Sequence, residues 1–188
     1  MNQHELDIIT SALRGERAGQ RKLYDSLSPW VLGICARYSR DRTEAHDMAQ
    51  EAWIKVFAKL SSYSMKGNFR GWVGRITTNT CIDILRKRQL DIDDDYHRRL
   101  ETNESNIPKQ LTTCSNAVSN MTTEDLLKLV QRLPERFRLV FNMVAVEGYT
   151  HQEVAEKLGI TTSTSRSQLS RARVNLQKQF KKLFALCV

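Results

Sequence analysis

Apolar residues recur every three or four positions over most of this sequence, which is the period of a helix that buries one face. The clearest example is residues 43–60, where Thr43 is the expected N-cap. The stripe there consists of Ala45, Met48, Ala49, Ala52, Trp53, Val56, Phe57 and Leu60. The same period recurs over residues 23–38 and 69–84 and again after residue 121, without the alternation typical of strands. The sequence therefore predicts an all-α fold.

The middle of the chain, residues 91–120, differs from both flanks. It is rich in Asp, Asn, Ser and Thr and has few large apolar residues, so it buries too little to offset the entropy of ordering. It carries 3 basic and 6 acidic side chains, whereas residues 1–90 carry 15 and 9 and residues 121–188 carry 11 and 6. We therefore expect two small helical domains, 1–90 and 121–188, joined by a flexible acidic and polar linker.

The overall charge favours an anionic partner. The 188 residues carry a net charge of +8, and the sequence pI is about 9.5; nucleic acid is the usual partner of such a protein. The first ten residues do not resemble a signal peptide, and no apolar stretch approaches the length of a membrane helix. We expect a cytoplasmic protein without direct membrane insertion.

The spacing of the cysteine and acidic residues in the sequence does not match that of a metal site. Cys35, Cys81, Cys114 and Cys187 are far apart in the sequence, and we interpret them as reduced thiols of a cytosolic protein. The cluster Asp91, Asp93, Asp94 and Asp95 has no surrounding ligand set. We therefore expect no metal and no cofactor.

The segment after Gly148 has the pattern of a helix-turn-helix. Thr150 and Glu153 form a capping box, and Gly159 supplies the positive φ of the turn. A second helix starts near Thr162 and carries Arg, Ser and Gln on its outer faces, which suits the major groove of DNA. The alternative is a solvated charged face on an ordinary helical hairpin.

Three segments together resemble a known family. Residues 147–173, from Glu147-Gly148-Tyr149-Thr150 to Arg171-Ala172-Arg173, resemble the promoter-binding region 4 of sigma factors. Residues 47–57, Asp47-Met48-Ala49-Gln50-Glu51-Ala52-Trp53-Ile54-Lys55-Val56-Phe57, resemble the polymerase-binding part of region 2. Residues 69–76, with Asn79 and Asp83-Ile84-Leu85-Arg86, resemble its promoter-melting part. The order and the short middle segment are similar to the extracytoplasmic-function (ECF) group.

The resemblance implies a role for each matching position. It implies that core RNA polymerase is bound by Asp47, Gln50, Glu51 and Ile54. It implies that the −10 promoter DNA is contacted by Lys66, Asn68, Phe69, Arg70, Arg75, Asn79 and Arg86, although Phe69 and Trp72 could instead be core residues. It implies that the −35 DNA is contacted by Arg166, Ser167, Ser170, Arg171 and Arg173. An anti-sigma factor is the expected further partner.

Two positions depart from the commonest pattern of region 4. Ser163 stands where Gly is usual in the turn, and Ser165 stands where an apolar residue usually packs. A hydroxyl there can bond back to the helix backbone. These two serines therefore leave the position of the second helix unfixed by the family pattern.

Two other classes of protein share parts of this pattern. A transcription regulator with a C-terminal helix-turn-helix shares the DNA-binding end but does not explain the Asp47, Gln50 and Glu51 face. A nucleic-acid-processing enzyme requires a metal cluster, a phosphate-binding glycine loop or a nucleophile with its base. The four His residues are scattered and no such loop occurs, so we expect no catalytic site.

Overall fold

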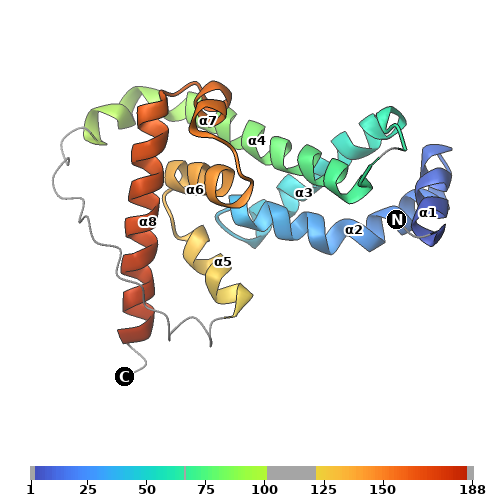
Figure 1. Ribbon diagram of the computed structural model, residues 1–188, viewed down its shortest axis with the longest axis horizontal. Helices are drawn as coiled ribbons and strands as arrows, with labels where there is room; N and C mark the ends of the chain where they lie inside the picture. Colours follow the sequence, from blue (N-terminus) through green and yellow to red (C-terminus); the bar gives the residue numbers. More distant parts are fainter. Residues whose placement is uncertain (1–2, 66, 101–121, 186–188) are drawn as a thin grey trace. The chain divides into compact units, whose positions relative to one another are not determined.

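The computed structural model describes residues 3–65, 67–100 and 122–185, and for residues 3–4, 89–100 and 183–185 it describes the helical backbone only. Every regular element in these ranges is helical (Figure 1). The chain divides into two compact units, residues 1–84 and residues 85–188. Within the described ranges, no helix combines the length and apolarity needed to cross a membrane. The all-α prediction is confirmed.

Unit 1 contains α1 (Gln3–Leu13), α2 (Arg17–Tyr38), α3 (Arg42–Lys59) and the first half of α4 (Phe69–Leu100), with a short 3-10 turn at Leu60–Ser62. Helix α2 packs against both α1 and α3. Glycine allows two of the close approaches: a Cβ at Gly19 would lie 2.6 Å from the Ala12 nitrogen, and one at Gly74 would lie 2.7 Å from the Trp30 ring. The core includes Val31, Cys35, Tyr38, Ala52, Val56, Val73 and Cys81.

Helix α3 has the predicted buried stripe but a different N-terminus. Asp41, with an extended backbone, is the N-cap, and its carboxylate accepts a hydrogen bond from the Glu44 amide at 2.9 Å. Thr43 already lies inside the first turn, so the prediction that it caps the helix is wrong. The carboxylate of Asp41 satisfies a free amide of the first turn, which a residue with helical backbone angles does not do.

Helix α4 runs on to Leu100, past the expected start of the linker at residue 91. The sequence from 86 to 100 contains neither Gly nor Pro, so nothing in it interrupts the backbone hydrogen bonds of a helix. Residues 101–121, including Cys114, lie outside the described residues.

Unit 2 contains α5 (Thr123–Gln131), α6 (Glu135–Phe141), α7 (His151–Leu158) and α8 (Thr162–Ala185). Helix α6 continues into one π-helical turn, Asn142–Val146. Helix α8 packs against α5, α6 and α7, and it runs as one long helix beside α6 (Figure 1). The core of unit 2 consists of Leu129, Leu133, Leu139, Val140, Met143, Val154, Ala155, Leu169 and Ala172.

A buried arginine forms hydrogen bonds with carbonyls at the C-terminal end of α5. Arg138 is 1% exposed, and its guanidinium donates to the carbonyls of Gln131 at 2.7 Å and Leu133 at 3.4 Å. These carbonyls lie at the C-terminal end of α5, where the helix leaves acceptors unsatisfied. Arg138 therefore joins α6 to α5 through hydrogen bonds that the sequence pattern does not reveal.

Candidate nucleic-acid and partner-binding surfaces

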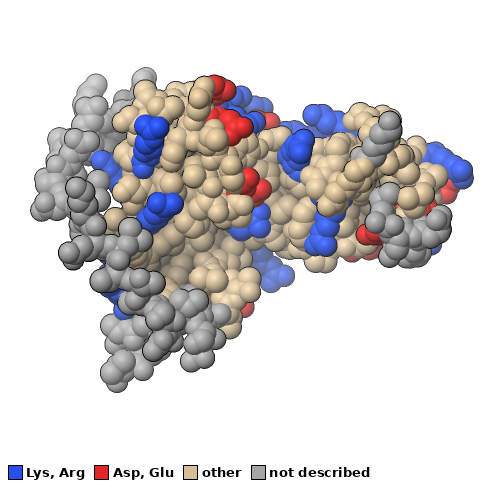
Figure 2. Space-filling view, in the orientation of Figure 1, with Lys and Arg blue, Asp and Glu red and all other residues tan. Residues whose placement is uncertain are grey.

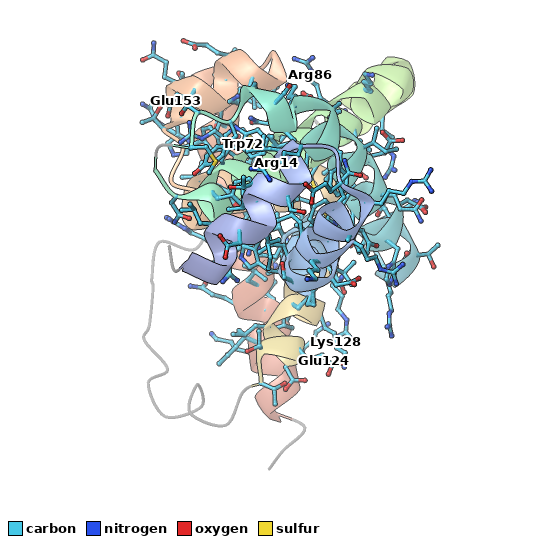
Figure 3. All side chains as sticks on the ribbon, turned by 90° about the vertical axis from the view of Figure 1, so that its right-hand side faces the viewer. Arg14, Trp72, Arg86, Glu124, Lys128 and Glu153 are labelled. Carbon is cyan, nitrogen blue, oxygen red and sulfur yellow. The ribbon has the colours of Figure 1, made fainter. Side chains whose placement is uncertain are left out.

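The first helix of the helix-turn-helix is capped at both ends as predicted. The Thr150 amide donates to the Glu153 carboxylate at 2.8 Å, and the Glu153 amide donates to the Thr150 hydroxyl at 3.2 Å. The Thr150 hydroxyl also donates to the Glu153 carboxylate at 2.8 Å. The bonds that this carboxylate accepts from the Thr150 amide and hydroxyl hold the pKa of Glu153 below its usual value. Gly159 closes the helix with a φ of 70°. Figure 3 shows Glu153 on α7, the helix that begins at this cap.

The second helix, α8, begins at Thr162 as predicted and is held to α7 by a buried hydroxyl. The Thr161 hydroxyl accepts a hydrogen bond from the Thr164 amide at 3.0 Å. Ser165 is fully buried, and its Oγ lies 2.9 Å from Nδ1 of the half-buried His151. The hydroxyl at the unusual position therefore reaches across to the first helix.

The outer surface of α8 carries the predicted DNA-binding side chains. Arg166 and Arg173 are exposed, whereas Ser167, Ser170 and Arg171 are half-buried. The Ser167 hydroxyl donates to the Thr164 carbonyl at 2.9 Å, so it turns partly back toward its own helix. Arginine and serine side chains on one helix can bond phosphates and base edges.

The outer face of α3 combines carboxylates with an exposed apolar side chain. Asp47, Gln50, Glu51 and Ile54 follow the i, i+3, i+4, i+7 spacing of one helix face, and all four are exposed. Ile54 is 62% exposed. We call this set the α3 face.

An aromatic group extends the apolar surface beside α3. Tyr24, itself 41% exposed, lies 5.0 Å from Trp53, and Trp53 stacks on Phe57 at 5.3 Å. The sequence did not predict the exposure of Tyr24, because no local pattern distinguishes an exposed tyrosine from a buried one.

The loop before α4 is supported by packed aromatic rings. Phe69 is 5% exposed and contacts Tyr63 edge-on at 4.9 Å and Trp72 at 5.7 Å. The ring of Phe69 thus belongs to the core, and Trp72 is half-buried (Figure 3). Of the two possibilities stated for Phe69, the structure supports the core role.

The remaining candidates near this loop differ in what they contact. The Asn68 side chain accepts from the Gly71 amide at 3.2 Å, as an N-cap of α4 does. The Arg70 guanidinium lies 4.7 Å from the centre of the Trp30 ring. Arg75 is exposed and Asn79 is half-buried, whereas Lys66 lies outside the described residues.

Arg86 lies farther along α4, in unit 2. It is exposed and donates to the Lys157 carbonyl at 3.3 Å. Figure 2 shows several lysine and arginine side chains at the surface.

Two cysteines that are remote in the sequence lie side by side in unit 1. The sulfur atoms of Cys35 and Cys81 are 3.7 Å apart, and both residues are fully buried. Across the part of the chain that the structure describes, no group of three or more His, Cys, Asp or Glu side chains could hold a metal ion.

Comparison with known proteins assigns both units to one family. Residues 23–90 match the family model for sigma-70 region 2, and residues 123–176 match the model for sigma-70 region 4. The ECF RNA polymerase sigma factor SigW of Bacillus subtilis is 26% identical over 183 residues, which are 93% of this chain and 96% of SigW. The ECF sigma-E factor of Escherichia coli is 28% identical over 175 residues, 88% of each chain.

A further relative is longer than this chain. The ECF sigma factor SigE of Mycolicibacterium smegmatis is 30% identical over 150 residues, which are 78% of this chain and 56% of SigE. Among solved structures, the sigma factor RpoE in complex with the anti-sigma factor NepR from Bartonella quintana matches 86% of this chain and 96% of that chain at 21% identity, with a TM-score of 0.48.

The chain belongs to the sigma-70 family, in the ECF group of RNA polymerase sigma factors. Proteins of this class direct RNA polymerase to promoters, and as a class they are not enzymes. The resemblance stated from the sequence is confirmed.

Proposed function

We propose that the α3 face is the main contact with core RNA polymerase. The observation that carries this proposal is the exposure of Ile54 within a face of carboxylates and an amide. A large exposed apolar side chain framed by polar groups is the pattern of an interface anchor. Carboxylates at Asp47 and Glu51 suit arginine side chains on the partner, because such pairs form two parallel hydrogen bonds.

The −10 DNA is then bound by the loop before α4 and by the first half of α4. Arg70 and Arg75 are exposed cations at this end of the helix, and Asn79 follows one turn later. Capturing unstacked bases costs a few kcal/mol each, about the scale that pocket contacts and phosphate contacts return. Asn68 and Phe69 hold the loop and the start of the helix in shape, through a cap and a buried ring. By the family resemblance, Lys66 and Arg86 are further proposed contacts of the −10 strand.

The −35 DNA is bound by α8. Arg166, Arg171 and Arg173 supply the cations, and Ser167 and Ser170 supply hydroxyls on the same helix. A bidentate arginine–guanine pair contributes about 1–3 kcal/mol of discrimination. An anti-sigma factor is part of the proposal through membership of the ECF group, and the α3 face is the surface for which it would compete.

The first test is run-off transcription with purified core polymerase on genomic fragments. We expect discrete transcripts with the wild-type protein and none with Asp47→Ala/Glu51→Ala, because that variant loses two charged contacts to polymerase. The matched control is Glu124→Ala/Glu156→Ala, which removes two exposed carboxylates from unit 2 and should transcribe normally. Equal transcription by both double variants would contradict the proposed role of the α3 face.

A second test isolates the −35 contact. Arg171→Ala should weaken binding to the promoter recovered from the first test, by about 1–3 kcal/mol, and should relax sequence preference at one position. Lys181→Ala removes an exposed cation near the other end of the same helix and serves as the control. A loss that is equal for promoter and random DNA would indicate a phosphate contact instead of base readout.

A further inference from the structure

Cys35 and Cys81 form a pair that neither DNA binding nor polymerase binding uses. Cys35 lies on α2 and Cys81 on α4, 46 positions apart in the sequence, yet their sulfur atoms are only 3.7 Å apart. Both residues are 0% exposed, and neither is in a disulfide. The packing of unit 1 therefore places two thiols in contact while both remain reduced.

We propose that Cys35 and Cys81 are a redox pair that forms a reversible disulfide when the protein meets a two-electron oxidant such as a peroxide. A disulfide bond is about 2.05 Å long, so the sulfurs must approach by roughly 1.7 Å, a distance that side-chain rotation with small helix adjustment can provide. Both S–H bonds break and one S–S bond forms. With hydrogen peroxide, the two electrons cleave its O–O bond, and the two protons leave in the two water molecules formed.

The burial of the pair determines how this reaction proceeds. A peroxide reaches a fully buried thiol only when unit 1 opens locally. The first thiol to react becomes a sulfenic acid, and its neighbour then attacks that sulfur, expels water and closes the disulfide. Oxidation is therefore slow in native buffer and faster in urea concentrations below the unfolding transition.

The bond joins helices on either side of the polymerase-binding segment. The closed loop from Cys35 to Cys81 contains all of α3 and the turn at Leu60–Ser62. Such a cross-link restricts the unfolded chain more than the folded one, so it raises the thermal stability of unit 1. The pair thus connects the redox state of the protein to the stability of the unit that carries the α3 face.

The test uses the full chain with Cys114→Ser and Cys187→Ser, so that only the buried pair can react. After treatment with hydrogen peroxide, the protein is denatured and alkylated with N-ethylmaleimide, and its intact mass is measured by mass spectrometry. We expect a mass lower by two hydrogen atoms, no alkylation, and recovery of both thiols with dithiothreitol. Peptide mapping of oxidised wild-type protein should give the same Cys35–Cys81 cross-link.

Stability provides an independent measurement. All three tryptophans, Trp30, Trp53 and Trp72, lie in unit 1, so their fluorescence follows its unfolding. The midpoint should rise by at least about 5 °C on oxidation, and Cys35→Ser or Cys81→Ser in the same background should abolish the rise. Two alkylatable thiols after exhaustive oxidation, a product with oxygen added to one sulfur, or a cross-link between two chains would overturn the proposal.

Discussion

Replacing Ser165 by alanine should loosen the attachment of α8 to α7. Alanine removes only Oγ, which lies 2.9 Å from Nδ1 of His151. Ser165 is fully buried, whereas His151 is half-buried. The substitution therefore deletes one hydrogen bond and leaves a ring nitrogen that water can partly satisfy.

The expected loss of stability follows from the different burial of the two partners, because Ser165 is fully buried and His151 is half-buried. A hydrogen bond between neutral groups contributes about 0.5–1.5 kcal/mol, and leaving a buried group unsatisfied costs more. Because the hydroxyl itself is removed and the histidine is within reach of water, we expect a loss of about 1 kcal/mol in the unfolding free energy of unit 2. This corresponds to about a fivefold change in its unfolding equilibrium constant.

A double-mutant cycle measures the pair directly. Urea unfolding of the wild type, Ser165→Ala, His151→Ala and the double variant is followed by far-UV circular dichroism. Tryptophan fluorescence reports unit 1 alone and should not change across the four proteins. We expect a coupling energy of about 1 kcal/mol, because each single variant removes the same hydrogen bond.

The same cycle has a functional readout. Affinity for −35 DNA, measured by fluorescence anisotropy at one fixed salt concentration, should fall for both single variants and fall little further for the double variant. Ser163→Ala removes an exposed hydroxyl from the same turn of α8 and is the matched control. A coupling energy below about 0.3 kcal/mol, together with unchanged DNA affinity, would refute the role assigned to this contact.

Three other substitutions probe the packing and the caps. Arg138→Met removes two charge-assisted hydrogen bonds to carbonyls at the end of α5. It should lower the free energy of unfolding of unit 2 by about 3 kcal/mol, measured by urea unfolding. A loss below about 1 kcal/mol would mean that the buried charge is not net stabilising. Gly74→Ala places a Cβ 2.7 Å from the Trp30 ring and should lower the free energy of unfolding of unit 1 by about 1–3 kcal/mol. The Cβ of Gly33→Ala, on α2, meets open space, so this variant should raise the same free energy by up to about 1 kcal/mol. The pKa of Glu153 is lowered in the folded protein, so its ionised form contributes stability that is present above the unfolded-state pKa and lost as pH falls through the folded-state pKa. Glu153→Gln should therefore flatten the acid side of a plot of melting temperature against pH. An unchanged slope of that plot on the acid side would contradict this role.

The local features of the fold were the ones that the sequence predicted. The capping box at Thr150 and Glu153, the positive φ at Gly159 and the buried stripe of α3 involve residues within a few positions of one another. Hydrophobic period and cap chemistry act over this range, so one sequence is enough to read them. The N-cap of α3 shows the limit, because Asp41 and Thr43 are both good capping residues and only the backbone angles choose between them.

The features that escaped prediction depend on contacts between helices. Cys35 meets Cys81 across 46 positions, and Ser165 meets His151 across the turn of the helix-turn-helix. The residue type alone does not predict either contact, because cysteine and serine occur in many different environments. The sequence left two roles open for Phe69, and only its contacts with the rings of Tyr63 and Trp72 favour the core role.

The fold of unit 2 depends on polar contacts as well as on apolar packing. Its apolar core is accompanied by a buried arginine, a buried hydroxyl and two complete capping boxes. Small domains bury a low fraction of their surface, so helix caps and buried polar contacts contribute a substantial share of their stability. A polar contact also has a narrower geometry than an apolar one. In unit 2 these contacts hold both ends of α5, the start of α7 and the start of α8. The orientation of α8 decides which side chains face DNA. We therefore expect substitutions at the buried polar positions of unit 2 to alter promoter selectivity before they unfold the protein.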